Sequence, residues 1–253
     1  MEAAARSPGR TVSAYENSAA AYDVLHAARG KAYRREAATV VDRIHRHLPG
    51  AGSILDVACG TGLHLATFAA LGFDVEGVDL SASMIEEARG RVPGAVLHQG
   101  DMRTFRLARR FDAVVCLFSS IGYMRTPADL ATSLATMRDH LVDGGVLVVE
   151  PWYEPDRWHD GAVFGEGAEA GGLAVARVSR SWREGDESVI EMHFAVARSD
   201  RTWAFTEVHR MGLMTTAAQL ELYCDVGLVV QHEHPGLTDR GLFVAVKPRA
   251  ETR

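Results

Sequence analysis

From about residue 52 to residue 150, short apolar runs alternate with segments whose apolar residues recur every three or four positions. The runs are typical of buried strands: "SILDVA", "FDVEGVDLS", "AVLHQGD", "FDAVVCLFSS" and "GGVLVVEPW". The segments between them predict helices: "LHLATFAALG", "ASMIEEARGRV" with Ser81 as N-cap, and "TPADLATSLATMRDHL" with Thr126 as N-cap. Strands that alternate with helices form parallel sheets covered on both faces, so this region predicts a doubly wound α/β domain.

The flanking segments extend the same domain. Residues 19–48 predict helices that are interrupted at Gly30. Near the other end, "TAAQLELYCDVG" predicts a helix, and "LVVQHEH" and "GLFVAVK" predict strands at the antiparallel edge of the sheet. We therefore expect a seven-stranded, mostly parallel sheet, with a core domain over 15–150 and 214–248 and a flexible tail over 1–14.

Apolar and polar residues follow a different pattern after Pro151. "LAVARVSRSWREG", "ESVIEMHFAVA" and "RTWAFTEVHRMGLM" alternate with a period of two, and turn residues interrupt them at Gly185–Asp186 and Ser199–Asp200. This pattern predicts an antiparallel β insertion after the fifth strand, over 151–213, with its strands between about 160 and 213.

Composition and charge narrow the classes of function. The chain has 253 residues and a formal net charge of −6, which argues against nucleic acid as the main partner. Its three cysteines form no CxxC pair, so neither a disulfide framework nor a cysteine zinc site is expected. No apolar run approaches the length of a membrane span, and the first residues lack the apolar core of a signal peptide. We expect a cytoplasmic protein that does not bind a membrane.

The loop "DVACGTG" (56–62) joins the first strand to a helix. Its glycines allow the backbone to approach a ligand, and the helix start offers free N–H groups. The loop does not match the dinucleotide fingerprint G-x-G-x-x-G in either alignment: Ala58 replaces the first glycine in one and Leu65 replaces the last glycine in the other. This argues against a nicotinamide oxidoreductase. Asp56 at the strand end would repel a pyrophosphate but suits a cationic group.

Two further acidic residues follow later strands. Asp79 can accept hydrogen bonds from a ribose diol, while Asp101 can accept from an adenine amino group as Met102 packs on the ring. A loop, a cationic amino acid group, a ribose and an adenine together describe S-adenosylmethionine, and the spacing resembles that of class I methyltransferases. The predicted cofactor contacts in this region are Asp56, Ala58, Gly60, Thr61, Gly62, Asp79, Leu80, Met84, Asp101 and Met102.

The fourth strand ends in "CLFSSIGYM" beside the first strand, where ligands bind in open α/β sheets. Phe118 can line the cofactor, and Ser119, Ser120 and Tyr123 can face polar groups of a methyl acceptor. The alternative is that the serines only cap the next turn. Methyl transfer is an in-line displacement that requires alignment and exclusion of water but no metal.

Seven stretches are similar to the N,N-dimethyltransferases of TDP-aminosugar biosynthesis, which finish amino sugars such as desosamine and mycaminose for antibiotics. They are "RGKAYRREA", "LDVACGTGLHL", "LHQGDMRTFRL", "FSSIGYM", "LVVEPW", "ARVSRSWREG" and "RGLF". The resemblance covers about 15–246, including the insertion. It implies a homodimer to which the insertion contributes, and two successive methylations of a sugar amine on a TDP carrier.

The resemblance also assigns roles to individual residues. Tyr15 or Tyr22, together with Tyr33, would close over the cofactor or the substrate. The residues placed near the sugar, and so candidates for catalysis, are Ser120, Tyr123 and Glu150. Arg240 would bind the diphosphate, since arginine suits bidentate phosphate contacts; the alternative is a surface salt bridge.

Several other residues are weaker candidates for contact with the substrate or for proton transfer. Trp152 and Tyr153 could stack on a thymine ring, or could be core aromatics, and Arg177 is a weaker candidate. His193 is a possible proton acceptor, although a packed or surface histidine is favoured there. We expect positioning and desolvation to provide most of the rate, so that Tyr123→Phe lowers turnover modestly.

Two other functions stay open at this stage. One is methylation of another small-molecule amine, hydroxyl or carboxyl group. The other is a module that binds S-adenosylmethionine without catalysis, which the intact loop and its acidic residues disfavour.

Overall fold

The computed structural model describes residues 19–249, so the predicted tail and Tyr15 lie outside the described residues. One sheet has the strand order β10-β11-β5-β4-β1-β2-β3. Its strands are β1 (Ser53–Val57), β2 (Asp74–Asp79), β3 (Val96–Gln99), β4 (Phe111–Cys116), β5 (Leu141–Val149), β10 (Val229–Glu233) and β11 (Leu242–Val246). The predicted seven-stranded, mostly parallel sheet is confirmed.

The direction of the last two strands corrects one detail of the prediction. β11 pairs antiparallel with both β5 and β10, so β10 runs in the same direction as the parallel strands. Only β11 runs in the opposite direction. The short connection after β10 reverses the chain, and β11 then pairs between β10 and β5.

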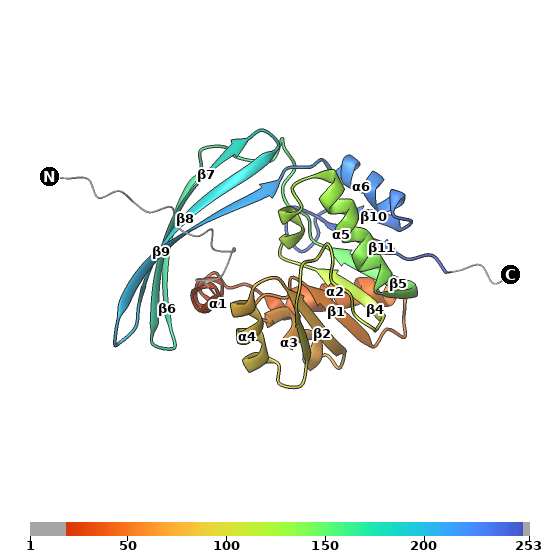
Figure 1. The fold of residues 1–253 in the computed structure, drawn as a ribbon, viewed down its shortest axis with the longest axis horizontal. Helices are drawn as coiled ribbons and strands as arrows, with labels where there is room; N and C mark the ends of the chain where they lie inside the picture. Colours follow the sequence, from red (N-terminus) through yellow and green to blue (C-terminus); the bar gives the residue numbers. More distant parts are fainter. Residues whose placement is uncertain (1–18, 250–253) are drawn as a thin grey trace.

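Helices cover both faces of this sheet (Figure 1). Side chains of neighbouring positions in a strand point to opposite faces. Val114 and Leu147 therefore pack toward α5 (Pro127–Asp139) and α6 (Thr216–Asp225), and their neighbours Val115 and Val148 pack toward the other face. The other helices are α1 (Ala19–Ala28), α2 (Tyr33–His47), α3 (Leu63–Ala70) and α4 (Ala82–Arg91). The predicted break at Gly30 and the N-caps Ser81 and Thr126 are confirmed.

The segment after β5 forms a second sheet in which all pairings are antiparallel. Its strands are β6 (Val163–Ala170), β7 (Leu173–Glu184), β8 (Glu187–Ala197) and β9 (Thr202–Gly212). This sheet stands away from the main sheet, and α1 lies in the angle between the two (Figure 1). Leu25 of α1 joins an apolar cluster with Leu173, Val175, Phe194 and Val196 of the second sheet.

Two elements were not predicted from the sequence. β6 is rich in Gly, Glu and Ala, which are poor strand formers, and it owes its conformation to pairing with β7. The other is the short 3₁₀ helix η1 (Ser120–Tyr123), which places two of the predicted site residues.

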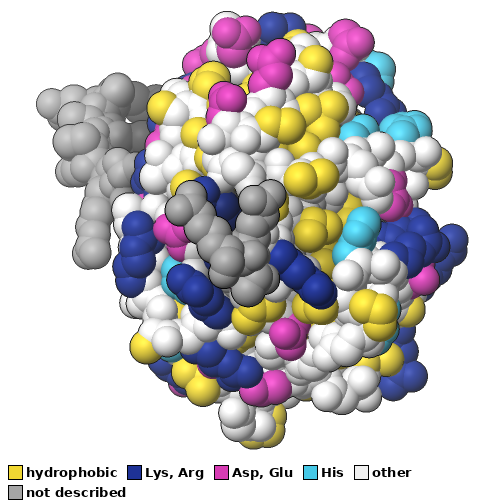
Figure 2. Space-filling view, turned by 90° about the vertical axis from the view of Figure 1, so that its right-hand side faces the viewer, with side chains coloured by type: hydrophobic (Ala, Val, Ile, Leu, Met, Phe, Trp, Pro, Cys, Tyr) yellow, Lys and Arg dark blue, Asp and Glu magenta, His cyan; other side chains and the backbone are white. Residues whose placement is uncertain are grey.

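The right-hand side of Figure 1, where α6, β10 and β11 lie, shows Lys and Arg side chains in several separate groups, with acidic side chains gathered near the top (Figure 2). Among the described residues of this face, the basic groups do not join into the continuous stripe that is typical of nucleic-acid binding. No helix within residues 19–249 is long and apolar enough to cross a membrane.

Gly212 lies where the last strand of the insertion meets the core. A Cβ at Gly212 would lie 2.9 Å from Cα and 3.0 Å from the carbonyl oxygen of Arg125, so the backbones would have to separate. We expect Gly212→Ala to lower the free energy of unfolding, measured in urea, by about 1–3 kcal/mol. Gly165→Ala is the control, because its Cβ would meet nothing closer than 3.7 Å. Equal effects of the two substitutions would contradict tight docking at Gly212.

Candidate active site

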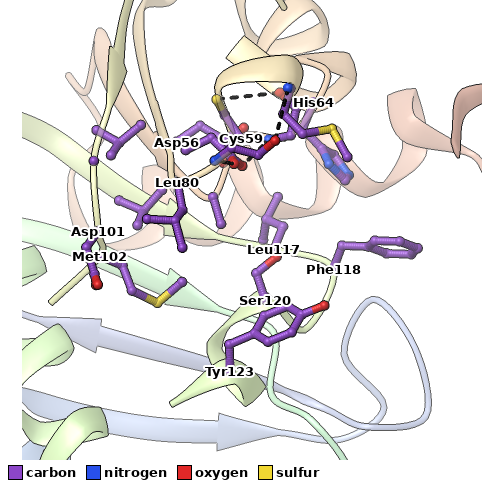
Figure 3. A pocket seen from close by; sticks show the side chains of 18 of the residues that line it. Asp56, Cys59, His64, Leu80, Asp101, Met102, Leu117, Phe118, Ser120 and Tyr123 are labelled. Atoms are coloured by element: carbon purple, nitrogen blue, oxygen red, sulfur yellow. Dashed lines mark hydrogen bonds between the residues drawn. The ribbon is translucent and has the colours of Figure 1, made fainter. Parts of the chain in front are cut away.

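The carboxyl ends of β1, β2 and β4 converge on a cavity of about 300 Å³ (Figure 3). It is lined by these predicted site residues: Tyr22, Tyr33, Asp56, Ala58, Gly60, Thr61, Asp79, Leu80, Met84, Asp101, Met102, Phe118, Ser120 and Tyr123. Leu117, Phe118, Ser120 and Tyr123 lie together, across the cavity from Asp56 of β1 and His64 of α3. The remaining predicted residues within the described range lie outside this lining: Gly62, Ser119, Glu150, Trp152, Tyr153, Arg177 and Arg240.

Asp79 organises the loop after β1. One carboxylate oxygen accepts from the N–H of Gly60 at 2.9 Å and the other from the N–H of Ser81 at 2.8 Å. A carboxylate offers about four lone-pair sites, so Asp79 can still accept from two further hydroxyls. This geometry fits the predicted contact with a ribose diol.

The backbone of the loop takes the left-handed conformation at Ala58, Gly60 and Gly62, with φ of 59°, 55° and 80°. Ala58 is strained in this region, as non-glycine residues at functional sites often are. A Cβ at Gly62 would lie 3.1 Å from Cβ of Ala88 in α4. Gly62 therefore allows two helices to pack closely, whereas the prediction made it a cofactor contact.

Asp56 is buried at the end of β1, on the floor of the cavity. Burial, and secondly the charge of Asp79, raise the pKa of Asp56 to about 8. A cationic ligand group beside this carboxyl would favour its ionised form, so the site can gain charge complementarity on binding.

Asp101 lies at another edge of the cavity and has a partner that the sequence did not reveal. Its carboxylate accepts from Arg103 Nη2 at 2.6 Å and Nε at 3.0 Å, and this bonding lowers the pKa of Asp101. Leu80 is 59% exposed although apolar, and it lines the cavity together with Met102. The side chains of Leu80 and Met102 suit the two faces of a planar ring. If Asp101 accepts from an adenine amino group as predicted, its carboxylate oxygens must accept from that group and from Arg103 at the same time.

Helix α1 closes one side of the cavity. Asp23 accepts from the hydroxyl of Thr61 at 2.7 Å and also pairs with Arg91 of α4, which ties the helix to the loop. The ring of Phe118 meets His26 edge-on at 4.9 Å. Burial, followed by the charges of Arg29, Arg177 and Lys31, lowers the pKa of His26 to about 3, so this imidazole is neutral at physiological pH.

A two-residue turn after β4 creates the wall opposite the loop. Phe118 and Ser119 both have a positive φ, of 56° and 60°. The segment after β5 holds this conformation, because Glu150 accepts from the N–H of Phe118 at 2.8 Å and the Pro151 carbonyl accepts from the Ser119 hydroxyl at 2.6 Å. Ser119 was predicted to face the acceptor, but its hydroxyl is buried in this contact with Pro151. It makes no capping bond to the following 3₁₀ turn either, which was the alternative.

Glu150 was predicted to lie near the sugar as a catalytic group, yet its oxygens are occupied inside the protein. Besides Phe118, it accepts from the hydroxyl of Thr238 at 2.9 Å and from Arg240 Nη2 at 2.8 Å. Its side chain is only 1% exposed. Glu150 therefore joins three chain segments, and it does not line the cavity.

The other predicted substrate contacts have partners within the insertion or between the insertion and the core. The guanidinium carbon of Arg240 lies 5.2 Å from the ring centre of Tyr153, and the indole of Trp152 donates to Ser188 of β8 at 2.8 Å. Arg177 pairs with Glu166 of the neighbouring strand at 2.7 Å. The contacts of Arg240, Trp152, Tyr153 and Arg177 with a substrate therefore stay predictions.

Two histidines of this region were missed from the sequence. His64 lines the cavity and is held by Glu36 at 2.7 Å. His209 lies 2.6 Å from the hydroxyl of Tyr123, and Glu207 lies 3.3 Å from its other nitrogen. The alternation in "TEVHRMG" was a signal for the second pair, since it places Glu207 and His209 on one face of a strand.

Comparison with known proteins agrees with this geometry. A family model described as a methyltransferase domain matches residues 54–145. A dTDP-3-amino-3,6-dideoxy-alpha-D-glucopyranose N,N-dimethyltransferase of Streptomyces fradiae is 46% identical and covers 92% of either chain. A dTDP-3-amino-3,4,6-trideoxy-alpha-D-glucopyranose N,N-dimethyltransferase of Streptomyces venezuelae is 44% identical over 89% of this chain and 95% of its own. The chain belongs to the dTDP-aminosugar N,N-dimethyltransferase family.

Solved structures support the same assignment. DesVI of Streptomyces venezuelae is 43% identical, with a TM-score of 0.86 over 92% of this chain and 99% of its own. CalS10, an amino pentose methyltransferase of Micromonospora echinaspora solved with S-adenosylmethionine bound, is 42% identical, with a TM-score of 0.80 over 90% and 96% of the two chains. The predicted family, fold and cofactor are confirmed.

S-adenosylmethionine is the cofactor of this dTDP-aminosugar N,N-dimethyltransferase family member, and the residues of the cavity fit it. Asp79 can hold the ribose hydroxyls, Leu80 and Met102 can flank the adenine, and Asp56 can face the cationic amino acid group. Within residues 19–249, no three His, Cys, Asp or Glu side chains are grouped so as to hold a metal ion.

Glu150 and Arg240 form a buried ion pair, which allows a structural role to be tested. Glu150→Gln leaves the Arg240 guanidinium without a counterion, so we expect the free energy of unfolding to fall by about 3–5 kcal/mol. Glu150→Gln combined with Arg240→Met should recover part of this loss, because no isolated charge stays buried. If the double variant is less stable than Glu150→Gln alone, the pair is not the reason for the loss.

The raised pKa of Asp56 predicts a pH dependence. Between about pH 4 and pH 8 the folded protein keeps a proton that the unfolded chain has lost, so this residue reduces stability as the pH rises. Asp56→Asn should therefore stabilise the cofactor-free protein more at pH 8 than at pH 5, as measured by urea unfolding, and should weaken S-adenosylmethionine binding in calorimetry. The exposed Asp139→Asn is the control. A stability gain independent of pH would contradict the assignment.

Proposed function

We propose that this chain transfers methyl groups twice to the amino group of a TDP-linked amino-deoxysugar in the biosynthesis of an antibiotic sugar. The observation that carries the proposal is identity above 40%, over about nine tenths of the chain and including the insertion, to relatives named for this reaction. Likeness confined to the cofactor loop would support only the cofactor, whereas here the acceptor wall and the second sheet are included.

The residues of the cavity divide between cofactor and acceptor. S-adenosylmethionine, when bound, supplies a methyl group on a cationic sulfur. Ser120 and Tyr123 present hydroxyls on the wall formed after β4, where they can orient the sugar amine. Phe118, packed against His26, can exclude water from the reacting centre.

The nucleotide carrier is assigned to the region around Arg240. This side chain lies beside Tyr153 and Trp152, and its Nε is buried without a hydrogen-bond partner. Aromatic faces and a guanidinium suit a thymine ring and a phosphate. For Arg240 to contact a diphosphate, it must share its remaining donors while it keeps its bond to Glu150.

A homodimer and a cytoplasmic location belong to the same proposal. The outward face of the second sheet carries exposed Val163, Val178 and Val208, which would suit a contact with a second subunit.

The proposal is tested by incubating the pure protein with S-adenosylmethionine and a panel of TDP-3-amino and TDP-4-amino deoxysugars, followed by mass spectrometry. We expect one member to gain one and then two methyl groups, because both products must fit the same pocket. The same sugars without the nucleotide are the matched control and should react poorly.

Two results would contradict the proposal. If S-adenosylmethionine binds and no panel member reacts, the acceptor belongs to another class, such as a free amine or hydroxyl. If the free sugars react as well as the TDP sugars, the nucleotide is not recognised and Arg240 has no assigned partner.

A further inference from the structure

Two buried side chains of the insertion lie behind Tyr123. The Tyr123 hydroxyl is 2.6 Å from Nδ1 of His209, and Nε2 of His209 is 3.3 Å from a carboxylate oxygen of Glu207. The side chains of His209 and Glu207 are 2% and 5% exposed. Because Tyr123 lines the cavity, these contacts connect the acceptor wall to a buried carboxylate.

The local structure accounts for this arrangement. Glu207 and His209 are two residues apart in β9 and so share the face that meets η1, which carries Tyr123. A single tautomer satisfies both contacts: Nδ1 accepts from the Tyr123 hydroxyl and the Nε2–H donates to Glu207.

Other charged groups near this site are already paired. Arg177 lies on the same face of the second sheet and pairs with Glu166 at 2.7 Å. Arg125 follows η1 and pairs with Glu187 of β8 at 3.3 Å. The carboxylate of Glu207 is a charged group in direct contact with the imidazole of His209.

We propose that Tyr123, His209 and Glu207 form a proton relay that deprotonates the acceptor ammonium, an inference that rests on the proposed function. An N–H bond of the ammonium breaks, and its proton passes to the Tyr123 oxygen while the Tyr123 O–H proton passes to Nδ1 of His209. The nitrogen retains the electron pair with which it attacks the methyl group. Tyr123 is the catalytic residue, and His209 is a positioning residue that acts through it.

Two successive methylations require this step twice. Transfer of a methyl group to a neutral primary amine yields a secondary ammonium, which has no lone pair until it loses a proton. The relay would therefore act before each transfer, with the proton leaving His209 for solvent between them. This revises the expectation that Tyr123→Phe has only a modest effect, since the effect should depend on pH.

His209→Asn tests the relay, because the Asn oxygen can accept from Tyr123 at the position of Nδ1 but cannot take up a proton. We expect turnover at pH 6.5 to fall about 100-fold relative to the unmodified protein. At pH 9.5 the substrate amine is already neutral and the difference should shrink to about threefold. Tyr123→Phe should give the same profile, and monomethylated product should accumulate with both variants.

The matched control is His193→Asn, which changes an exposed histidine on the opposite face of the same sheet and should leave the profile unchanged. A readout besides turnover is the nitrogen chemical shift of His209, which should report an imidazolium when a TDP-aminosugar and S-adenosylhomocysteine are bound at pH 7.5. Glu207→Gln is a second variant in case His209→Asn does not fold, and it should also lose turnover mainly at low pH.

The outcomes separate the two proposals. The relay is wrong, and the proposed function stands, if the unmodified protein methylates a TDP-aminosugar and His209→Asn lowers turnover by the same factor at pH 6.5 and at pH 9.5. A neutral His209 in the bound complex would overturn the relay as well. If the unmodified protein methylates no panel member, the proposed function fails, and with it the relay, which needs an ammonium acceptor.

Discussion

The buried carboxylate of Glu150 fixes the wall of the cavity on which we propose that the acceptor lies. It accepts hydrogen bonds from the backbone of Phe118, from Thr238 and from Arg240. Glu150 follows β5, so these bonds attach two other segments to the end of β5: the segment after β4 and the connection before β11. The two residues with positive φ after β4 are costly conformations, each by about 1–3 kcal/mol. They persist because Glu150 and Pro151 hold them in place, and as a result Ser120 and Tyr123 face the cavity.

The insertion completes the site from the other side. Helix α1 is tied to the cofactor loop through Asp23 and to β6 through the ion pair of Arg29 with Glu166. β9 meets η1, where His209 contacts the hydroxyl of Tyr123. The main sheet thus provides the predicted cofactor contacts, whereas the wall that carries Ser120 and Tyr123 depends on both sheets.

The sequence predicted the parts of the site that depend on local pattern. Asp56 and Asp79 end strands, and the carboxyl ends of parallel strands meet at one edge of the sheet, so their place in the cavity followed from their positions in the chain. Ser119 and Ser120 are adjacent and chemically alike, and only the left-handed turn decides which one faces the cavity. The partners of Glu150 lie 32 to 90 residues away in the chain, and His209 lies 86 residues from Tyr123, so no local pattern reveals these contacts.

The most direct measurement is a crystal structure of the protein with S-adenosylhomocysteine and a TDP-aminosugar. We expect the ribose hydroxyls on Asp79, the sugar nitrogen within hydrogen-bonding distance of the Tyr123 hydroxyl, and Glu150 still bonded to Phe118 and Arg240. A sugar nitrogen directed away from Tyr123, or a Glu150 carboxylate released from Phe118 to contact the amine, would contradict this account of the site.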